Sequence, residues 1–168
     1  MTDVIVHAAE NDPPRILGLY AEARAFMAQA GNPGQWGRTG YPKAELLRDD
    51  IAKARLFAVR RGGETVGAFV LVFGEDPTYT VIENGAWPGD KPYGTIHRLC
   101  SATAEYGVAA SVIAYCEEEC RKRGADLRAD THAANKPMRH VLEKAGFKYC
   151  GVIHVADGSP RMAYQKEL

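Results

Sequence analysis

Gly107 lies where the chain changes character, within the stretch SATAEYGVAASVI (residues 101–113). Small and polar residues give way there to an apolar run, which predicts the end of a strand followed by a helix. The first turn of a helix carries unpaired backbone N–H groups and about half a positive charge, so it can bind a phosphate. A glycine in the preceding turn lets the backbone approach that phosphate closely, although it can also serve only to ease a tight turn. The segment has neither the GxGxxG pattern of dinucleotide sites nor the GKS or GKT ending of a P-loop.

The cysteines give no signal for a metal or a disulfide. They are Cys100, Cys116, Cys120 and Cys150, without a CxxC pair and without a histidine at zinc-finger spacing. We therefore expect reduced, mostly buried thiols and no bound metal.

Length and charge restrict the class of protein. The 168 residues suit one domain, residues 1–168, with a core of its own. The 21 lysines and arginines balance the 21 aspartates and glutamates, so no nucleic-acid partner is indicated. Apolar runs such as residues 68–73 are too short to cross a bilayer, and the N-terminus lacks the pattern of a signal peptide. We expect a cytoplasmic protein without a membrane partner.

Short elements separated by glycine and proline predict an α/β order with antiparallel hairpins at both ends. The first half is expected to contain a strand over 3–9, a helix from 13 that Asn11 or Asp12 caps, a loop over 31–42 and a helix over 43–54. A hairpin over 55–73, turning at Gly62 and Gly63, and an irregular connection over 74–93 follow. The second half is expected to contain a strand over 94–102, a helix ending near Arg123 and Gly124, a strand over 125–132, a helix over 135–146 and a hairpin over 147–168.

One of these helices carries a recognisable motif. NKPMRHVLEKAGF, residues 135–147, resembles motif B of the GCN5-related N-acetyltransferase (GNAT) family. The phrases QWGRTGYP, IENGAW and GTIHRL look like a bacterial subgroup of small GNAT proteins. The resemblance covers nearly the whole chain and implies a mixed, mostly antiparallel sheet of about six to seven strands, splayed at its central strands and flanked by about four helices.

The resemblance also implies a site for acetyl-coenzyme A. In the family, a loop of the form Q/R-x-x-G-x-G/A holds the pyrophosphate, and the pantetheine arm lies beside the central strand with the thioester near residues 97–101. Here the loop reads AEYGVA, residues 104–109, with Ala104 where arginine or glutamine is usual. The residues implied to bind the cofactor are Leu99, Cys100, Ser101, Glu105, Tyr106, Gly107, Val108, Ala109, Ala110 and Asn135.

Direct acetyl transfer to an amine needs a base, and two side chains are candidates. His97 alternates with Thr95 and Leu99 on the central strand, and an unperturbed histidine has a pKa of about 6.5. A buried histidine with a structural role is the alternative for His97. Glu83 can take the proton directly or through water, and an exposed loop carboxylate is the alternative for Glu83.

The acid that protonates the leaving thiolate has a weaker signal. Many family members use a motif B tyrosine, but Leu142 occupies that position here. Tyr164, a water or direct release of the thiolate must substitute, and a packed tyrosine is the alternative for Tyr164. Cys100 as the carrier of an acetyl-cysteine intermediate is less well supported than Cys100 as a small core residue.

Aromatic and polar residues are candidates for the acceptor side. Trp36, Tyr41 and Trp87 stand in two long loops and can wall a small-molecule pocket or contact a cationic amine, or else pin those loops to the domain. Asp130 and His132 share one face of the strand before residue 135 and can border the same gap. A structural pair or a helix cap is their alternative.

The function implied is an N-acetyltransferase acting on a primary amine of a small-molecule or amino-acid-like acceptor in a ternary complex with acetyl-CoA. The alternative is a non-catalytic acyl-CoA-binding or sensing domain, which Ala104 and Leu142 favour. A third hypothesis is an interaction module that binds no cofactor. A homodimer is an assembly that the sequence leaves open.

Overall fold

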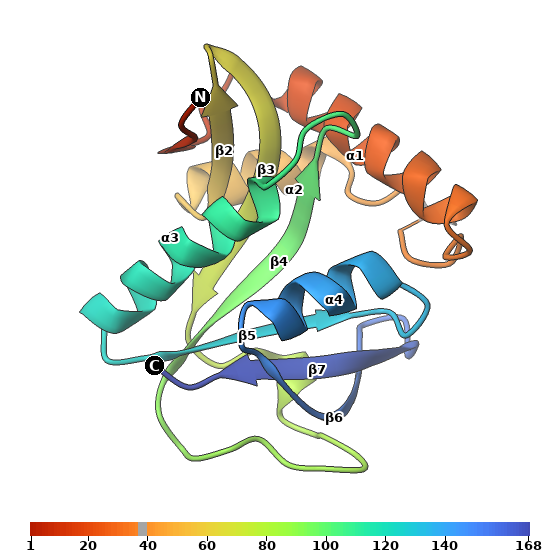
Figure 1. The fold of residues 1–168 in the computed structure, drawn as a ribbon, viewed down its shortest axis with the longest axis vertical. Coiled ribbons are helices and arrows are strands. Elements are labelled where there is room, and N and C mark those ends of the chain that lie inside the picture. Colours follow the sequence, from red (N-terminus) through yellow and green to blue (C-terminus); the bar gives the residue numbers. More distant parts are fainter. Residues whose placement is uncertain (37–39) are drawn as a thin grey trace. The chain divides into compact units, whose positions relative to one another are not determined.

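The structure is a computed structural model that describes residues 1–36 and 40–168. Its helices are α1 (Pro13–Gln29), η1 (a 3-10 helix, Pro77–Tyr79), α2 (Ala44–Ala52), α3 (Val108–Lys122) and α4 (Lys136–Lys144). Its strands are β1 (Val4–His7), β2 (Leu56–Arg61), β3 (Glu64–Phe73), β4 (Tyr93–Ser101), β5 (Asp126–Thr131), β6 (Lys148–His154) and β7 (Pro160–Lys166) (Figure 1). Residues 37–39 of the loop expected over 31–42 lie outside the described residues.

The described strands form one seven-stranded sheet in the order β1-β2-β3-β4-β5-β7-β6. The β4–β5 pair is parallel, whereas β1–β2, β2–β3, β5–β7 and β6–β7 are antiparallel. The register between β4 and β5 ends at Ile96 and Ala129, although both strands continue. The expected fold class, a mixed sheet with four α-helices, is confirmed.

Glycines and prolines set the element boundaries as the sequence predicted. Gly62 and Gly63, with φ of 56° and 86°, form the tight β2–β3 turn. Pro13 opens α1, where its missing N–H costs no helical bond. Asp12 occupies the expected N-cap position, but its side chain accepts the N–H of Ala9 at 2.7 Å and does not cap the helix.

The chain divides into two compact units. Unit 1 comprises residues 1–71 and 98–112, and unit 2 comprises residues 72–97 and 113–168. The expectation of a single domain stays a prediction.

Helix α1 supplies much of the apolar core of unit 1. Ile16, Leu19 and Tyr20 are fully buried and lie at helical spacing, so they share one face of the helix. The rings of Phe57 and Phe69 stack across β2 and β3 with their centroids 5.0 Å apart. Figure 1 shows α2 behind these strands. This core fixes the helices to the hairpin.

Unit 2 has its own core beneath the connection between β3 and β4, which spans residues 74–92. Tyr79, Tyr93, Ile153 and Ala163 form it. Helix η1 lies within this connection and was not expected. A helical turn there brings the buried Tyr79 down onto the sheet strands of unit 2.

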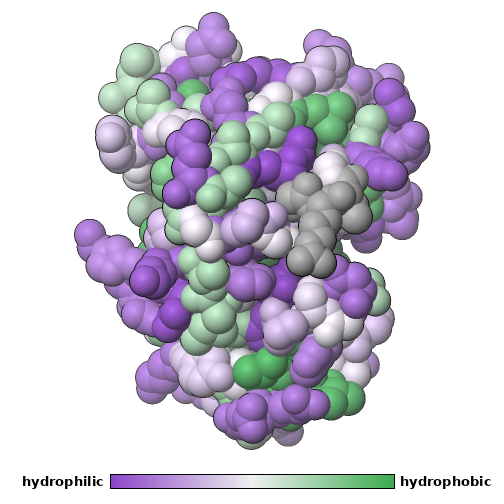
Figure 2. Space-filling view, turned by 90° about the vertical axis from the view of Figure 1, so that its right-hand side faces the viewer, coloured by the Kyte–Doolittle hydropathy of each residue, from purple (hydrophilic) through white to green (hydrophobic). Residues whose placement is uncertain are grey.

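The surface carries both polar and apolar side chains. On the face drawn in Figure 2, small hydrophobic groups lie among hydrophilic residues. Val81 and Tyr106 are exposed large apolar residues, at 68% and 87%. No helix in the described part of the chain is long and apolar enough to cross a bilayer.

Candidate active site

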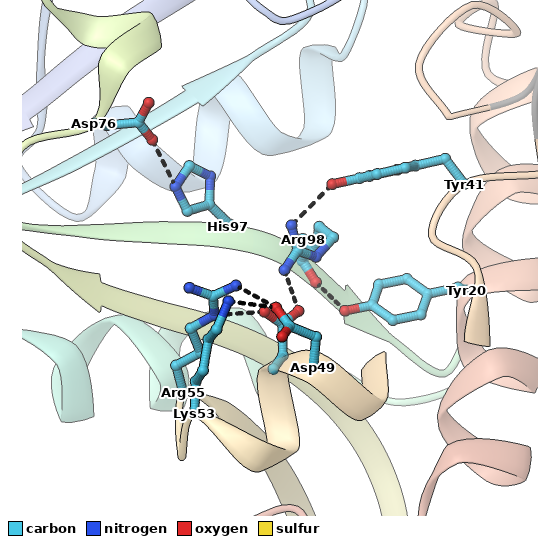
Figure 3. A network of polar contacts seen from close by, with 9 residues as sticks. Tyr20, Tyr41, Asp49, Lys53, Arg55, Asp76, His97 and Arg98 are labelled. Atoms are coloured by element: carbon cyan, nitrogen blue, oxygen red, sulfur yellow. Dashed lines mark hydrogen bonds and ion pairs between the residues drawn. The ribbon is translucent and has the colours of Figure 1, made fainter. Parts of the chain in front are cut away.

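The side chains of His97 and Asp76 form a pair in unit 2. Nε2 of His97 lies 3.0 Å from Oδ2 of Asp76 (Figure 3). The hydrogen bond from His97 is the main reason why the pKa of Asp76 is lowered to about 2, so Asp76 is a carboxylate at neutral pH. Neutral His97 therefore carries its proton on Nε2. Nδ1 has no hydrogen-bond partner among the described residues and can accept a proton.

A turn of its own fixes Asp76 in place. Oδ1 accepts the N–H and the hydroxyl of Thr78 at 2.9 and 2.7 Å. The backbone N–H of Asp76 donates to the hydroxyl of Tyr93 at 2.8 Å. The sequence Asp-Pro-Thr favours this turn, because aspartate readily accepts the N–H two residues onward and proline fixes φ. Oδ2 of Asp76 is therefore the oxygen that pairs with the His97 imidazole.

Tyr79 lies between two of the predicted site residues. Its hydroxyl donates to Oδ2 of Asp130 at 2.6 Å, and its ring centroid is 6.3 Å from that of His97. Burial raises the pKa of Asp130, and the Tyr79 hydrogen bond opposes this rise. The structure therefore brings His97 and Asp130 together around a buried tyrosine.

His132 and Asn135 hold the start of α4. Nδ1 of His132 accepts the N–H of Ala134 at 3.0 Å, and the Asn135 side chain accepts the N–H of Met138 at 3.2 Å. Burial lowers the pKa of His132. Strand β5 ends at Thr131, so the expectation that His132 shares a strand face with Asp130 is wrong. These contacts favour the cap alternative for His132.

Glu83 and Trp87 belong to the connection between β3 and β4. The backbone of Glu83 pairs with that of Val152 through two 2.8 Å hydrogen bonds, and its side chain is exposed. Nε1 of Trp87 donates to the carbonyl of Tyr79 at 2.8 Å, and the guanidinium of Arg128 lies 3.9 Å from its ring. Trp87 thus pins the connection to unit 2, and no contact joins Glu83 to His97 among the described residues.

Tyr164 is a buried residue of β7. Its hydroxyl lies 3.5 Å from Oε1 of Glu143 on α4, and burial raises its pKa. Leu142, also on α4, is fully buried. These contacts join β7 to α4 within unit 2, and none among the described residues connects Tyr164 to His97.

Gly107 caps α3 in unit 1. Its φ is 79°, its carbonyl accepts the N–H of Ser111 at 3.1 Å, and a Cβ added to it would meet nothing within 4 Å. The first turn of α3 contains no acidic residue, and its N–H groups at Val108, Ala109 and Ala110 precede the first helical bond. The start of α3 therefore presents backbone N–H groups beside an open position at Gly107.

Arg61 anchors the loop that leads to Gly107. Its guanidinium bonds both carboxylate oxygens of Asp3 at 2.7 and 3.0 Å, Oε2 of Glu105 at 2.7 Å and the carbonyl of Tyr106 at 3.1 Å. No sequence pattern points to Arg61, because its partners are distant along the chain. This ion pair keeps the Glu105 carboxylate next to the positive charge of Arg61.

Strand β4 is irregular at Arg98, whose φ is 50°. The expected alternation of His97 with Leu99 on one face is therefore wrong, since a left-handed residue interrupts the two-residue repeat. Cys100 is buried, and burial raises the pKa of its thiol to about 12, so it stays a protonated core residue. Leu99 and Ser101 are partly buried beside it in unit 1.

Trp36 and Tyr41 both contact aromatic or basic side chains of unit 1. Trp36 packs edge-on against Tyr20 with the centroids 5.6 Å apart. The hydroxyl of Tyr41 accepts a hydrogen bond from Nη1 of Arg98 at 2.8 Å (Figure 3). The Tyr20 hydroxyl donates to the carbonyl of Arg98 at 2.7 Å. Tyr41 therefore contacts β4 through Arg98, to which no sequence pattern gave a role.

Comparison with known proteins assigns the chain to a family. The model of the acetyltransferase (GNAT) family matches residues 25–147. The chain belongs to this GNAT family. A GNAT acetyltransferase from Streptococcus agalactiae 2603 is 32% identical over 99% of this chain and 95% of that chain, with a TM-score of 0.84. The family resemblance inferred from residues 135–147 is thus confirmed.

Other solved structures share the fold. One from Staphylococcus aureus MU50 is 26% identical over 98% of both chains, with a TM-score of 0.73. A GNAT structure from Listeria monocytogenes 4b F2365 is 17% identical over 99% of this chain and 95% of that chain, with a TM-score of 0.75, and shows the fold alone. No curated protein matches the chain.

GNAT proteins use acetyl-CoA, and the start of α3 fits a pyrophosphate. The open space at Gly107 and the absence of acidic residues in the first turn of α3 meet the demands of an anion. Within residues 1–36 and 40–168, no group of three or more histidine, cysteine, aspartate or glutamate side chains is arranged to hold a metal.

Proposed function

We propose that this protein is an N-acetyltransferase that moves the acetyl group of acetyl-CoA directly onto a primary amine of a small-molecule or amino-acid-like acceptor. The observation that carries the proposal is the pairing of His97 with Asp76, which leaves Nδ1 of His97 able to accept a proton. A base of this kind is what an amine, protonated at neutral pH, requires before it can act as a nucleophile.

The chain would hold acetyl-CoA through backbone groups. The N–H groups of Val108, Ala109 and Ala110 would bind the pyrophosphate, with Gly107 giving it room. When bound, acetyl-CoA supplies an activated acetyl group as a thioester. Ala104 contributes no polar contact, so we expect the affinity to rest on the backbone turn and on the loop that Arg61 holds.

His97 would remove a proton from the acceptor ammonium. The amine nitrogen then forms a C–N bond with the acetyl carbon, and the C–S bond breaks. Of the two protons that the ammonium loses, one is returned to the thiolate and the other leaves to solvent. Asp76 would stabilise the charge that His97 gains at 3.0 Å. Tyr164 bonds to Glu143 and not to His97, so we assign the return of the proton to water.

Calorimetry with acetyl-CoA, followed by measurement of free thiol in the presence of a mixed amine library, tests the function. We expect binding together with acceptor-dependent thiol release, and we expect His97→Gln to bind acetyl-CoA normally and release thiol at least about a hundredfold more slowly. Unchanged turnover in His97→Gln would remove the base from the mechanism.

A non-catalytic acyl-CoA sensor is the second candidate. It is favoured by Leu142, a fully buried side chain that cannot act as an acid, and by Ala104. This candidate predicts acetyl-CoA binding with no thiol release for any amine. Absence of binding would reject both candidates.

A further inference from the structure

Arg98 has hydrogen-bonding capacity that the protein does not use. Nη1 donates to Tyr41 and Nη2 to Asp50, whereas Nε is buried without a partner in the described part of the chain. An unpaired N–H on a buried guanidinium is costly, so an acceptor group is needed nearby. The side chain is only 12% exposed. A ligand that reaches it would be largely desolvated.

Tyr41 presents a second donor. Its hydroxyl accepts from Arg98 and keeps its own O–H, for which no described residue serves as acceptor. Nη1 of Arg24 bonds the Tyr41 carbonyl at 3.0 Å, which fixes the backbone that carries this hydroxyl. Arg98 and Tyr41 therefore form one cluster of donors, held from both ends (Figure 3).

The charges around Arg98 leave one positive charge uncompensated. The fully buried carboxylate of Asp50 pairs with both Arg98 and Arg55, the latter at 2.5 Å. Asp49 pairs with both Lys53, at 2.7 Å, and Arg55, at 3.2 Å. Three cations thus share two carboxylates, of which only Asp50 is buried. A further carboxylate would complete the balance, and planar guanidinium groups recognise carboxylates in a bidentate manner.

Arg98 also has an unusual backbone conformation in β4. It follows His97 directly in β4 and holds a left-handed backbone, with φ of 50°, that is uncommon for arginine. Strain of this kind persists only where the surroundings impose it, often at functional sites. The Tyr20 hydroxyl bonded to the Arg98 carbonyl helps to impose it.

We propose that Arg98 and Tyr41 bind the carboxylate of the acceptor, which is therefore a free amino acid or a close analogue. The inference rests on the proposed function and narrows its substrate class. It assigns specificity to residues that take no part in moving the proton.

Binding to the full-length protein tests this without relying on turnover. The probes are common amino acids and their carboxamides, which keep the amine and the shape but lose the negative charge. In calorimetry or thermal-shift titrations with coenzyme A present, we expect at least one amino acid to bind at least about tenfold more tightly than its amide, because a charge-assisted hydrogen bond is lost with the carboxylate.

Variants then show which residues cause the preference for the amino acid over its amide. Replacing Arg98 alone would strand the buried Asp50, so the test variant is Arg98→Gln with Asp50→Asn. The matched control is Arg60→Gln with Asp12→Asn, which alters another arginine–aspartate pair of unit 1, joined at 2.8 Å. We expect the first double variant to bind acid and amide alike and the control to keep the preference. Tyr41→Phe should weaken binding of the acid about threefold or more without stranding a charge.

Equal binding of acids and amides by the unaltered protein would overturn the proposal, as would no binding of either. Retention of the preference in the Arg98→Gln, Asp50→Asn variant would overturn it too. If that double variant does not fold, the Tyr41→Phe variant provides the test. Unchanged binding of the amino acid by Tyr41→Phe would then reject the proposal. Thiol release is measured separately. An amino acid that binds through Arg98 but is never acetylated would reject the proposed function while leaving the binding site in place.

Discussion

Nε2 of His97 lies 3.0 Å from Oδ2 of Asp76, and the two residues come from β4 and from the connection that precedes it. Thr78 and Tyr93 hold Asp76 from its other sides. The carboxylate therefore orients the imidazole and sets the nitrogen that carries its proton. Asp76 acts through His97, which makes it a positioning residue.

The first prediction is that Asp76→Asn lowers kcat about tenfold or more and leaves the affinity for acetyl-CoA unchanged. The asparagine amide can donate to Nε2, which moves the imidazole proton to Nδ1 and removes the base. Asp76→Glu should recover part of the rate. Steady-state kinetics with calorimetry separate the two quantities, and a change confined to cofactor affinity would contradict the positioning role.

The second prediction concerns stability against acid. The pKa of Asp76 falls from its ordinary value of 3.8 to about 2 in the folded protein, chiefly through the His97 hydrogen bond. Because the folded pKa is the lower one, the stabilisation from ionised Asp76 is complete above about pH 4 and is lost as the pH falls toward 2. Urea unfolding of the unaltered protein and of Asp76→Asn should give a stability difference that shrinks over this range. A difference independent of pH would argue against the pair.

The third prediction tests the phosphate turn. Gly107→Trp should abolish binding of acetyl-CoA, because its side chain would fill the open space at the start of α3. Gly158→Trp is the control, since Gly158 has a φ of 82° against 79° for Gly107 and equally open surroundings. Both variants carry the same backbone strain of about 1–2 kcal/mol, but only one should lose the cofactor in calorimetry. Normal binding by Gly107→Trp would refute the assignment of the loop.

Sequence patterns sufficed where a local signal determines the structure. The Gly62–Gly63 turn and the start of α1 at Pro13 each depend on residues within a few positions. The helical spacing of Ile16, Leu19 and Tyr20 likewise indicates the buried face of α1. The elements and the family could therefore be inferred from the sequence.

The polar contacts of the candidate site could not be predicted in the same way. Asp76 stands in an irregular connection, and its turn with Thr78 has a local signal, whereas its contact with His97 depends on how unit 2 folds. The bond from Arg98 to Tyr41 spans 57 positions. Nothing in the sequence indicates that an arginine takes a left-handed backbone, so the strand alternation failed at Arg98.

The fourth prediction is that Arg61→Gln weakens acetyl-CoA binding about threefold to tenfold. Without the guanidinium, the Glu105 carboxylate would be released two residues before Gly107 and would repel the phosphates. Glu105→Gln in the same chain should restore part of the affinity, because the Asp3 carboxylate also loses its Arg61 partner. S-acetylpantetheine, which lacks the pyrophosphate, should bind both variants equally. Loss of S-acetylpantetheine binding in Arg61→Gln would show general damage to the site instead.

The fifth prediction compares two glycines of unit 1. A Cβ at Gly67 would lie 2.6 Å from Cγ1 of Val108 and 3.0 Å from the carbonyl of Cys100, whereas a Cβ at Gly18 would meet nothing within 4 Å. Gly67→Ala should therefore lower the free energy of unfolding by about 1–3 kcal/mol, because β3 and the start of α3 must move apart. Gly18→Ala, within helix α1, should raise it by about 0.5–1 kcal/mol. Urea denaturation measures both changes. Val108 begins the turn proposed to bind pyrophosphate, so Gly67→Ala should also weaken acetyl-CoA binding, whereas Gly18→Ala should not. Equal affinity for acetyl-CoA in the two variants would show that the packing of β3 does not position that turn.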